Sequence, residues 1–189
     1  MFRTLSTRKI GFFSLLFSAL VSPLAWSESS VRLTTNVGVI DVTLYDSQAP
    51  ETVKNFLELV DSGFYSGLIF HRVLAGFVIQ AGGYDEKLVY RDPPRTVKNE
   101  SKVGLGNRKG TLAMARLDDP DSADTQFFIN VKDNPHLNAK PGIPGYTVFG
   151  EVVSGWEVVE TIELSEVGTR DGMQGVPKTT MVILKAERI

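Results

Sequence analysis

The sequence predicts a mainly β protein, folded as a closed eight-stranded antiparallel β-barrel capped by two α-helices. Three observations lead to this fold class. From residue 31 onward, most of the chain alternates apolar and polar residues with period two, in roughly eight short runs. Only two segments have helical spacing, so the regular strand–helix alternation that a parallel sheet needs is missing. Closure into a barrel would also remove the exposed edges of so many short strands.

The expected strands are short runs separated by turn residues. Asn36-Val37-Gly38 joins the first two as a hairpin, and Ala75-Gly76 separates the third from the fourth. Polar or proline-rich loops separate most of the later strands. In chain order, the expected strands span residues 31–35, 39–45, 68–74, 77–82, 111–116, 125–131, 146–153 and 179–189.

Both expected helices have start signals. The first covers residues 49–61, with Pro50 and Glu51 in its first turn, and Ser62-Gly63 ends it. The second covers residues 154–163, with Ser154 as the expected N-cap. Two helices of this length are suited to covering the ends of a barrel.

The first 27 residues have the layout of a cleavable signal peptide. Arg3, Arg8 and Lys9 precede an apolar run, and Ala25-Trp26-Ser27 places small residues at the expected cleavage site. Serines and a proline interrupt the apolar run, which favours cleavage over an uncleaved membrane anchor. We therefore expect a leader at 1–27, a single domain at 28–189, and an exported protein, in the periplasm of a Gram-negative host.

The composition excludes several classes of function. The chain has no cysteine, which rules out disulfides and thiolate chemistry, and it has only two histidines, so we expect no metal site. Removing the leader takes away three positive charges and shifts the formal net charge from −2 to −5. Neither nucleic acid nor, after cleavage, a membrane is then an expected partner.

Residues 70–82, FHRVLAGFVIQAG, place Arg72 and Gln80 within apolar strand sequence. The segment resembles the FHRV-x-x-GF-x-IQGG motif of cyclophilin-type peptidyl-prolyl cis-trans isomerases. Four further stretches are similar to that family in the same order, so the resemblance extends from Val31 to the C-terminus, with the bacterial periplasmic branch the most similar. These stretches are residues 49–56, 110–115, 125–129 and 148–155.

The resemblance implies an eight-stranded barrel with two helices, which agrees with the sequence pattern. It also implies an isomerase of X-Pro bonds that needs no cofactor and acts on proline-containing segments of unfolded or folding exported proteins. A monomer is the default expectation for the oligomeric state, which the sequence does not fix. Rotation about a peptide bond breaks no bond and needs no nucleophile. A permanently protonated arginine that donates toward the prolyl nitrogen would favour the twisted amide. Arg72 is therefore the predicted catalytic residue.

The resemblance also predicts the binding residues. It places Phe77, Val78, Phe128 and Leu137 around the proline ring, and Gln80, Ala115 and Arg116 along the substrate backbone. His136 stands where many eukaryotic members have a tryptophan that helps to bind cyclosporin, which predicts weak cyclosporin affinity. Tyr146 stands where they often have a histidine. Both are added to the predicted binding residues, although His136 could equally be a surface residue.

Other interpretations remain open. Strand alternation places His71 opposite Arg72, as a packed histidine, and allows only one of Phe127 and Phe128 to line a site. The same reasoning requires Phe77 to belong to the Gly76 turn if it reaches the ligand with Val78 and Gln80. A non-catalytic chaperone that holds proline segments is the alternative function. A barrel that encloses a small apolar ligand is a third possibility, which the resemblance weakens.

Overall fold

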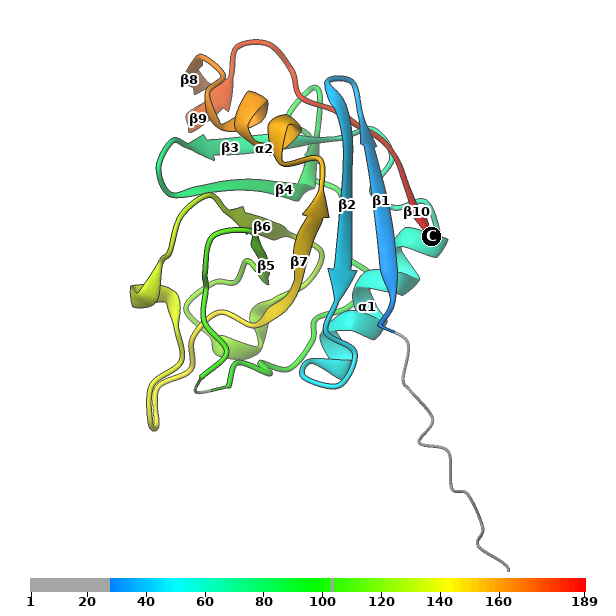
Figure 1. Cartoon of the computed structure of the whole chain (residues 1–189). Coiled ribbons are helices and arrows are strands. Elements are labelled where there is room, and N and C mark those ends of the chain that lie inside the picture. The colour runs from blue at the N-terminus through cyan, green and yellow to red at the C-terminus, as the bar shows by residue number, and fades with distance from the viewer. Residues whose placement is uncertain (1–27, 103) are drawn as a thin grey trace, which may run out of the picture.

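The structure is a computed structural model, and it describes residues 28–102 and 104–189. Because residues 1–27 lie outside this part of the chain, the expected leader is not described. The described residues form ten strands, two α-helices and two short 3-10 turns (Figure 1). The strands are β1 (Ser30–Thr35), β2 (Gly38–Leu44), β3 (Leu68–Leu74), β4 (Val78–Asp85), β5 (Thr111–Met114), β6 (Phe127–Asn130), β7 (Val148–Ser154), β8 (Val167–Arg170), β9 (Met173–Pro177) and β10 (Ile183–Arg188). The helices are α1 (Pro50–Asp61) and α2 (Trp156–Glu163), and the 3-10 turns are η1 (Pro120–Ser122) and η2 (Pro135–Leu137).

Eight strands form one antiparallel sheet in the order β10-β1-β2-β7-β5-β6-β4-β3. Its two edge strands meet through a bridge between Ile69 and Val182, and Phe70 N donates to Met181 O over 2.9 Å. The sheet is thus an almost closed barrel. The predicted mainly β fold with two helices is confirmed.

Side chains fill the barrel interior. Every second residue of β1 and β2, such as Leu33 and Val42, is fully buried. Helix α1 contributes Phe56, whose ring lies 5.5 Å from Phe127 and 5.1 Å from Phe149. This packing leaves α1 across one end of the barrel.

Helix α2 begins differently from the expectation. Its N-cap is Gly155, at φ 82°, and no side chain caps it, whereas Ser154 ends β7. A Cβ at Gly155 would lie 2.0 Å from the carbonyl oxygen of Val39, so only glycine fits between the barrel and the helix start. The predicted Ser154 cap is therefore wrong, because close packing rather than capping selects the residue at this position.

The hairpin of β8 and β9 was not predicted. It turns at Asp171-Gly172, both at positive φ, and an Asp-Gly pair is a strong signal for such a turn. The hairpin packs against β3, where Gly175 lies close to the carbonyl of Val73. Within the described residues, no helix is both long and apolar enough to cross a bilayer.

Candidate functional site

A cavity of about 200 Å³ lies on the outer side of the barrel. Nine of the ten predicted site residues line it, and no other residue of the described ranges does, so the structure gathers segments far apart in the sequence. They are Arg72, Phe77, Val78, Gln80, Ala115, Arg116, Phe128, Leu137 and Tyr146. The tenth, His136, is exposed and stacks on the Phe77 ring, with the two ring centroids 5.4 Å apart.

Irregular strand pairing turns Arg72 toward this cavity. Phe70 pairs with Ala81 and Arg72 with Gln80, so the register shifts between the two pairs. Phe70 is fully buried in the barrel core, whereas Arg72 is half-buried on the outer side. A β-bulge of this kind re-aims side chains and is common beside functional sites.

A chain of amides holds the guanidinium of Arg72. Its Nη1 donates to Oε1 of Gln80 over 3.2 Å, and Nε2 of Gln80 donates to Oε1 of Gln126 over 3.1 Å. Sequence reasoning missed Gln126. This residue directly precedes Phe127 and Phe128, the start of β6, and that position could have drawn attention to it. The charge of Arg72 is oriented by neutral groups, and among residues 28–102 and 104–189 no carboxylate lines the cavity.

His71 is buried, as predicted, but it does not lie on the side of the strand opposite Arg72. It lines the same groove as Arg72, and its ring lies 4.8 Å from that of Tyr84. The bulge at this point breaks the alternation on which the prediction rested. Burial lowers the pKa of His71 to about 4, which makes it neutral near pH 7.

The apolar wall of the cavity is separate from the barrel core. Val78 and Phe128 of this wall pack with Ala113 and Val148 in a buried cluster of their own, whereas Phe127 belongs to the barrel core. The two neighbouring phenylalanines therefore divide between core and site, as alternation predicts. Phe77 precedes β4 and belongs to the Gly76 turn, where its N–H donates to Leu74 O over 2.9 Å. The inference about that turn is confirmed.

Arg116 links the two loops beside the cavity. Its guanidinium donates to the carbonyls of Leu117 and Asp118 on one loop, and to those of Pro144 and Gly145 on the other. It also lies over the Tyr146 ring, 4.8 Å from the centroid. The Tyr146 ring in turn meets Phe128 edge to face at 5.7 Å, so these contacts shape one wall of the cavity.

A second hollow of about 450 Å³ adjoins the cavity and shares Arg72, Gln80, Ala115 and Arg116 with it. Its other lining is largely polar and was not predicted. Tyr90 donates to Asp124 over 2.9 Å, and burial together with this bond raises the pKa of Tyr90 to about 12. The remaining lining residues are His71, Tyr84, Leu117, Ser122, Gln126 and Met173. Because they share four lining residues, the two hollows are continuous with each other.

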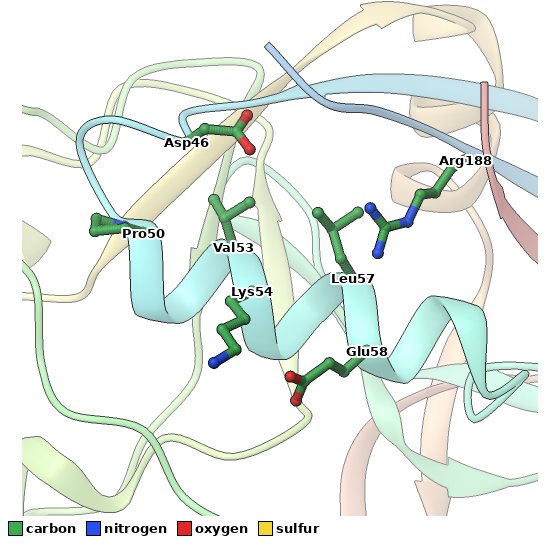
Figure 2. A pocket seen from close by; sticks show the side chains of 7 residues that line it. All are labelled: Asp46, Pro50, Val53, Lys54, Leu57, Glu58 and Arg188. Atoms are coloured by element: carbon green, nitrogen blue, oxygen red, sulfur yellow. The ribbon is translucent and has the colours of Figure 1, made fainter. Parts of the chain in front are cut away.

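Another hollow, of about 470 Å³, runs along α1 and contains none of the predicted residues (Figure 2). Lys54 and Glu58 point to one side of the helix there, whereas Val53 and Leu57 point to the other. Arg188 at its rim pairs with Asp61, and Glu58 pairs with Arg95. Two of its charged groups are thus paired with residues outside its lining, unlike Arg72, which is held by a neutral amide, and we do not consider it a candidate site.

Comparisons with known proteins agree with this geometry. Residues 30–188 match the family "Cyclophilin type peptidyl-prolyl cis-trans isomerase/CLD". A peptidyl-prolyl cis-trans isomerase of Acinetobacter baylyi is 44% identical over 168 residues, 89% of each chain. Peptidyl-prolyl cis-trans isomerase B of Escherichia coli K12 is 48% identical over 157 residues, 81% of this chain and 95% of the relative.

Solved structures show the same fold. A cyclophilin-type isomerase of Cryptosporidium parvum superposes with a TM-score of 0.72 at 29% identity, covering 86% of this chain and 98% of the other. The same protein in the presence of the dipeptide Ala-Pro gives a TM-score of 0.69 at 30% identity, covering 83% and 96%. The fold and these relatives place the chain among the prolyl isomerases. The chain belongs to the cyclophilin-type peptidyl-prolyl cis-trans isomerases, enzymes that interconvert the two forms of bonds preceding proline.

Proposed function

We propose that this isomerase acts on extended X-Pro segments of exported proteins and assists their folding. The proline ring would occupy the cavity lined by Phe77, Phe128 and Leu137, and the neighbouring residues would follow the adjoining hollow. The Cryptosporidium relative in the presence of Ala-Pro supports this class of ligand. The signal-like sequence at 1–27 supports export, with the enzyme released as a monomer into the periplasm.

Arg72 would supply the electrostatic part of catalysis. An X-Pro bond rotates slowly because amide resonance creates a barrier of about 18–20 kcal/mol. Resonance is lost as the bond twists, and the nitrogen lone pair becomes an acceptor for the guanidinium. One charge-assisted hydrogen bond of about 1.5–3 kcal/mol accelerates rotation roughly tenfold to a hundredfold. Preorganised apolar contacts to the ring would supply further acceleration.

The observation that carries this proposal is the position of Arg72. Its guanidinium is held by Gln80 at the wall of an apolar cavity whose lining includes no carboxylate. A protease-free assay on an X-Pro peptide should show turnover, and Arg72→Ala should remove most of it while circular dichroism stays unchanged. Unaltered activity in the folded variant would refute the role of Arg72.

Export needs a separate test. Expression of the full chain in a Gram-negative host should deliver a form that begins at Glu28 to the periplasmic fraction, as mass spectrometry can show. Retention of residues 1–27 on the purified protein would contradict the cleavage proposal.

One observation favours a chaperone activity beside the isomerase. Leu117 and Ile143 are 78% and 61% exposed, on the two loops that Arg116 joins beside the cavity. Such exposed side chains could bind apolar segments of unfolded chains. Suppression of aggregation should then survive Arg72→Ala and weaken in a Leu117→Ser, Ile143→Ser variant. Equal suppression by that double variant would contradict this second activity.

A further inference from the structure

Four asparagines form a hydrogen-bonded chain behind the apolar wall of the cavity. Asn134 donates through Nδ2 to Oδ1 of Asn130 over 2.8 Å, and Asn130 donates to Oδ1 of Asn107 over 3.3 Å. Asn107 donates to Oδ1 of Asn138 through its backbone N, over 2.7 Å, and through Nδ2, over 3.2 Å. Asn107, Asn130 and Asn134 are all at most 1% exposed, so water does not weaken these bonds.

One end of this asparagine chain holds the Phe77 turn. Nδ2 of Asn134 donates to the backbone carbonyl of Phe77 over 3.0 Å, and the same carbonyl accepts from Val131 N over 3.2 Å. Phe77 precedes β4, and the neighbouring Ala75 and Gly76 are exposed. The ladder pair of Leu74 and Val78 closes this turn and Glu163 accepts from Gly76 N over 2.9 Å, whereas Asn134 ties the turn to the protein from the inside.

Asn134 also lies at the start of the η2 turn, which forms the opposite wall of the cavity. Its backbone N donates to Asn107 O over 2.8 Å, and its carbonyl accepts from Leu137 N over 3.0 Å. This second bond closes the η2 turn, which presents Leu137 to the cavity and stacks His136 on Phe77. One buried residue thus contacts the backbone of both Phe77 and Leu137.

The hydrogen bonds of Asn134 come with a free-energy cost, so packing alone does not account for the residue at this position. Both amide hydrogens of Asn134 are used, while its Oδ1 is buried without a hydrogen-bond partner among the described residues. Rotating the amide by 180° would bring Oδ1 against the Phe77 carbonyl and lose the donors. A buried polar atom without a partner is rare and calls for an explanation. Holding the two walls in place explains it.

We propose that Asn134 is a positioning residue, which fixes the Phe77 turn and the η2 turn at the separation that receives the proline ring. This inference rests on the proposed binding of proline in the cavity. Asn134 does not itself line the cavity, so it acts through Phe77 and Leu137. Removing its side chain should release the Phe77 turn from the η2 turn and weaken binding, while the catalytic group Arg72 stays in place.

The test compares Asn134→Ala with Asn107→Ala, a matched control. Both remove one buried amide from the same chain, but the Asn107 side chain contacts neither Phe77 nor Leu137. Both variants should melt at lower temperature than the wild type. Only Asn134→Ala should raise KM for an X-Pro peptide about tenfold, with kcat within about twofold, because lost positioning weakens binding. If Asn134→Ala does not fold, Asn134→Ser takes its place in the comparison, because it is a smaller change that keeps a polar side chain.

A second readout separates this inference from the proposed function. The NMR signals of the His136 ring depend on the Phe77 ring stacked on it, so they should shift in Asn134→Ala and not in Asn107→Ala. This measurement works even if the wild type fails to turn over X-Pro peptides, which would refute the proposed function alone. Unchanged His136 signals in Asn134→Ala, or equal KM increases in both variants, would overturn the positioning role.

Discussion

Arg72 on β3 and Gln80 on β4 are paired across the sheet, and the guanidinium of Arg72 donates to the Gln80 amide oxygen over 3.2 Å. The partner that orients the cation is therefore neutral. A carboxylate in its place would hold the guanidinium at least as firmly but would neutralise its charge. The identity of residue 80 thus controls how much positive charge reaches the cavity.

Gln80→Glu should reduce kcat/KM by roughly tenfold, because an ion pair competes with the donation from Arg72 to the prolyl nitrogen. Higher salt should restore part of the activity by screening that pair. Gln80→Leu is the control, since it removes the orienting bond without adding charge and should show no such salt recovery. The isomerisation assay at low and high salt measures both effects, and wild-type activity in Gln80→Glu would contradict the argument.

Gly155→Ala should lower the free energy of unfolding by more than about 2 kcal/mol. The left-handed conformation alone costs a residue with a Cβ about 1–2 kcal/mol, and the new atom would also clash with Val39 O. Gly142→Ala is the matched control, because Gly142 has a similar φ of 75° with no atom within 4 Å of its Cβ position. Urea denaturation of both variants gives the comparison, and equal losses would argue against the close contact.

Glu100 caps the first turn of α1 from a distant loop. Its carboxylate accepts from the backbone N of Thr52 over 2.8 Å, from Thr52 Oγ1 over 2.7 Å and from Glu51 N over 3.2 Å. Glu100→Ala should lower the unfolding free energy by about 1–2 kcal/mol, and Glu100→Gln by less, since it keeps an acceptor but loses the charge near the helix N-terminus. Chemical denaturation measures the free energy of unfolding of both variants. Values equal to that of the wild type would show that the bonds to the carboxylate do not matter.

His71 should make stability depend on pH. Its pKa is about 4 in the folded protein, mainly because of burial, against about 6.5 in the unfolded chain. The unfolded state therefore binds the proton first, and stability falls as pH decreases from 6.5 to 4, by up to about 3 kcal/mol. Unfolding measured at pH 7.5 and 4.5 should show a smaller difference in His71→Gln than in the wild type. Parallel losses in the two proteins would contradict this assignment.

Sequence reasoning was most successful for the features that periodicity and local sequence signals determine. The eight barrel strands and the division of Phe127 and Phe128 between core and site follow from alternation, and the start of α1 follows from the Pro50 and Glu51 start signals. The gathering of Arg72 and Tyr146 around one cavity came from the family resemblance, because no local rule brings such distant residues together.

The features that sequence reasoning missed depend on tertiary contacts. The side of β3 on which His71 lies depends on a bulge, and the start of α2 depends on a carbonyl that belongs to Val39. Gln126 acts through a bond to Gln80 that exists only once β4 and β6 pair. The asparagine chain joins two loops through side chains, and side-chain spacing along the sequence does not reveal such contacts.

The seam of the barrel has a consequence for how the chain acquires its structure. Strand β10 pairs with β1, and the residues just before β10 bond to β3, so the most C-terminal of the described strands completes the sheet. Until residues 181–188 are available, β1 has only β2 as a neighbour and the barrel stays open. Contacts between such distant segments also form slowly. The barrel therefore cannot close before β10 has been synthesised, and the outer edges of β1 and β3 stay exposed until that point.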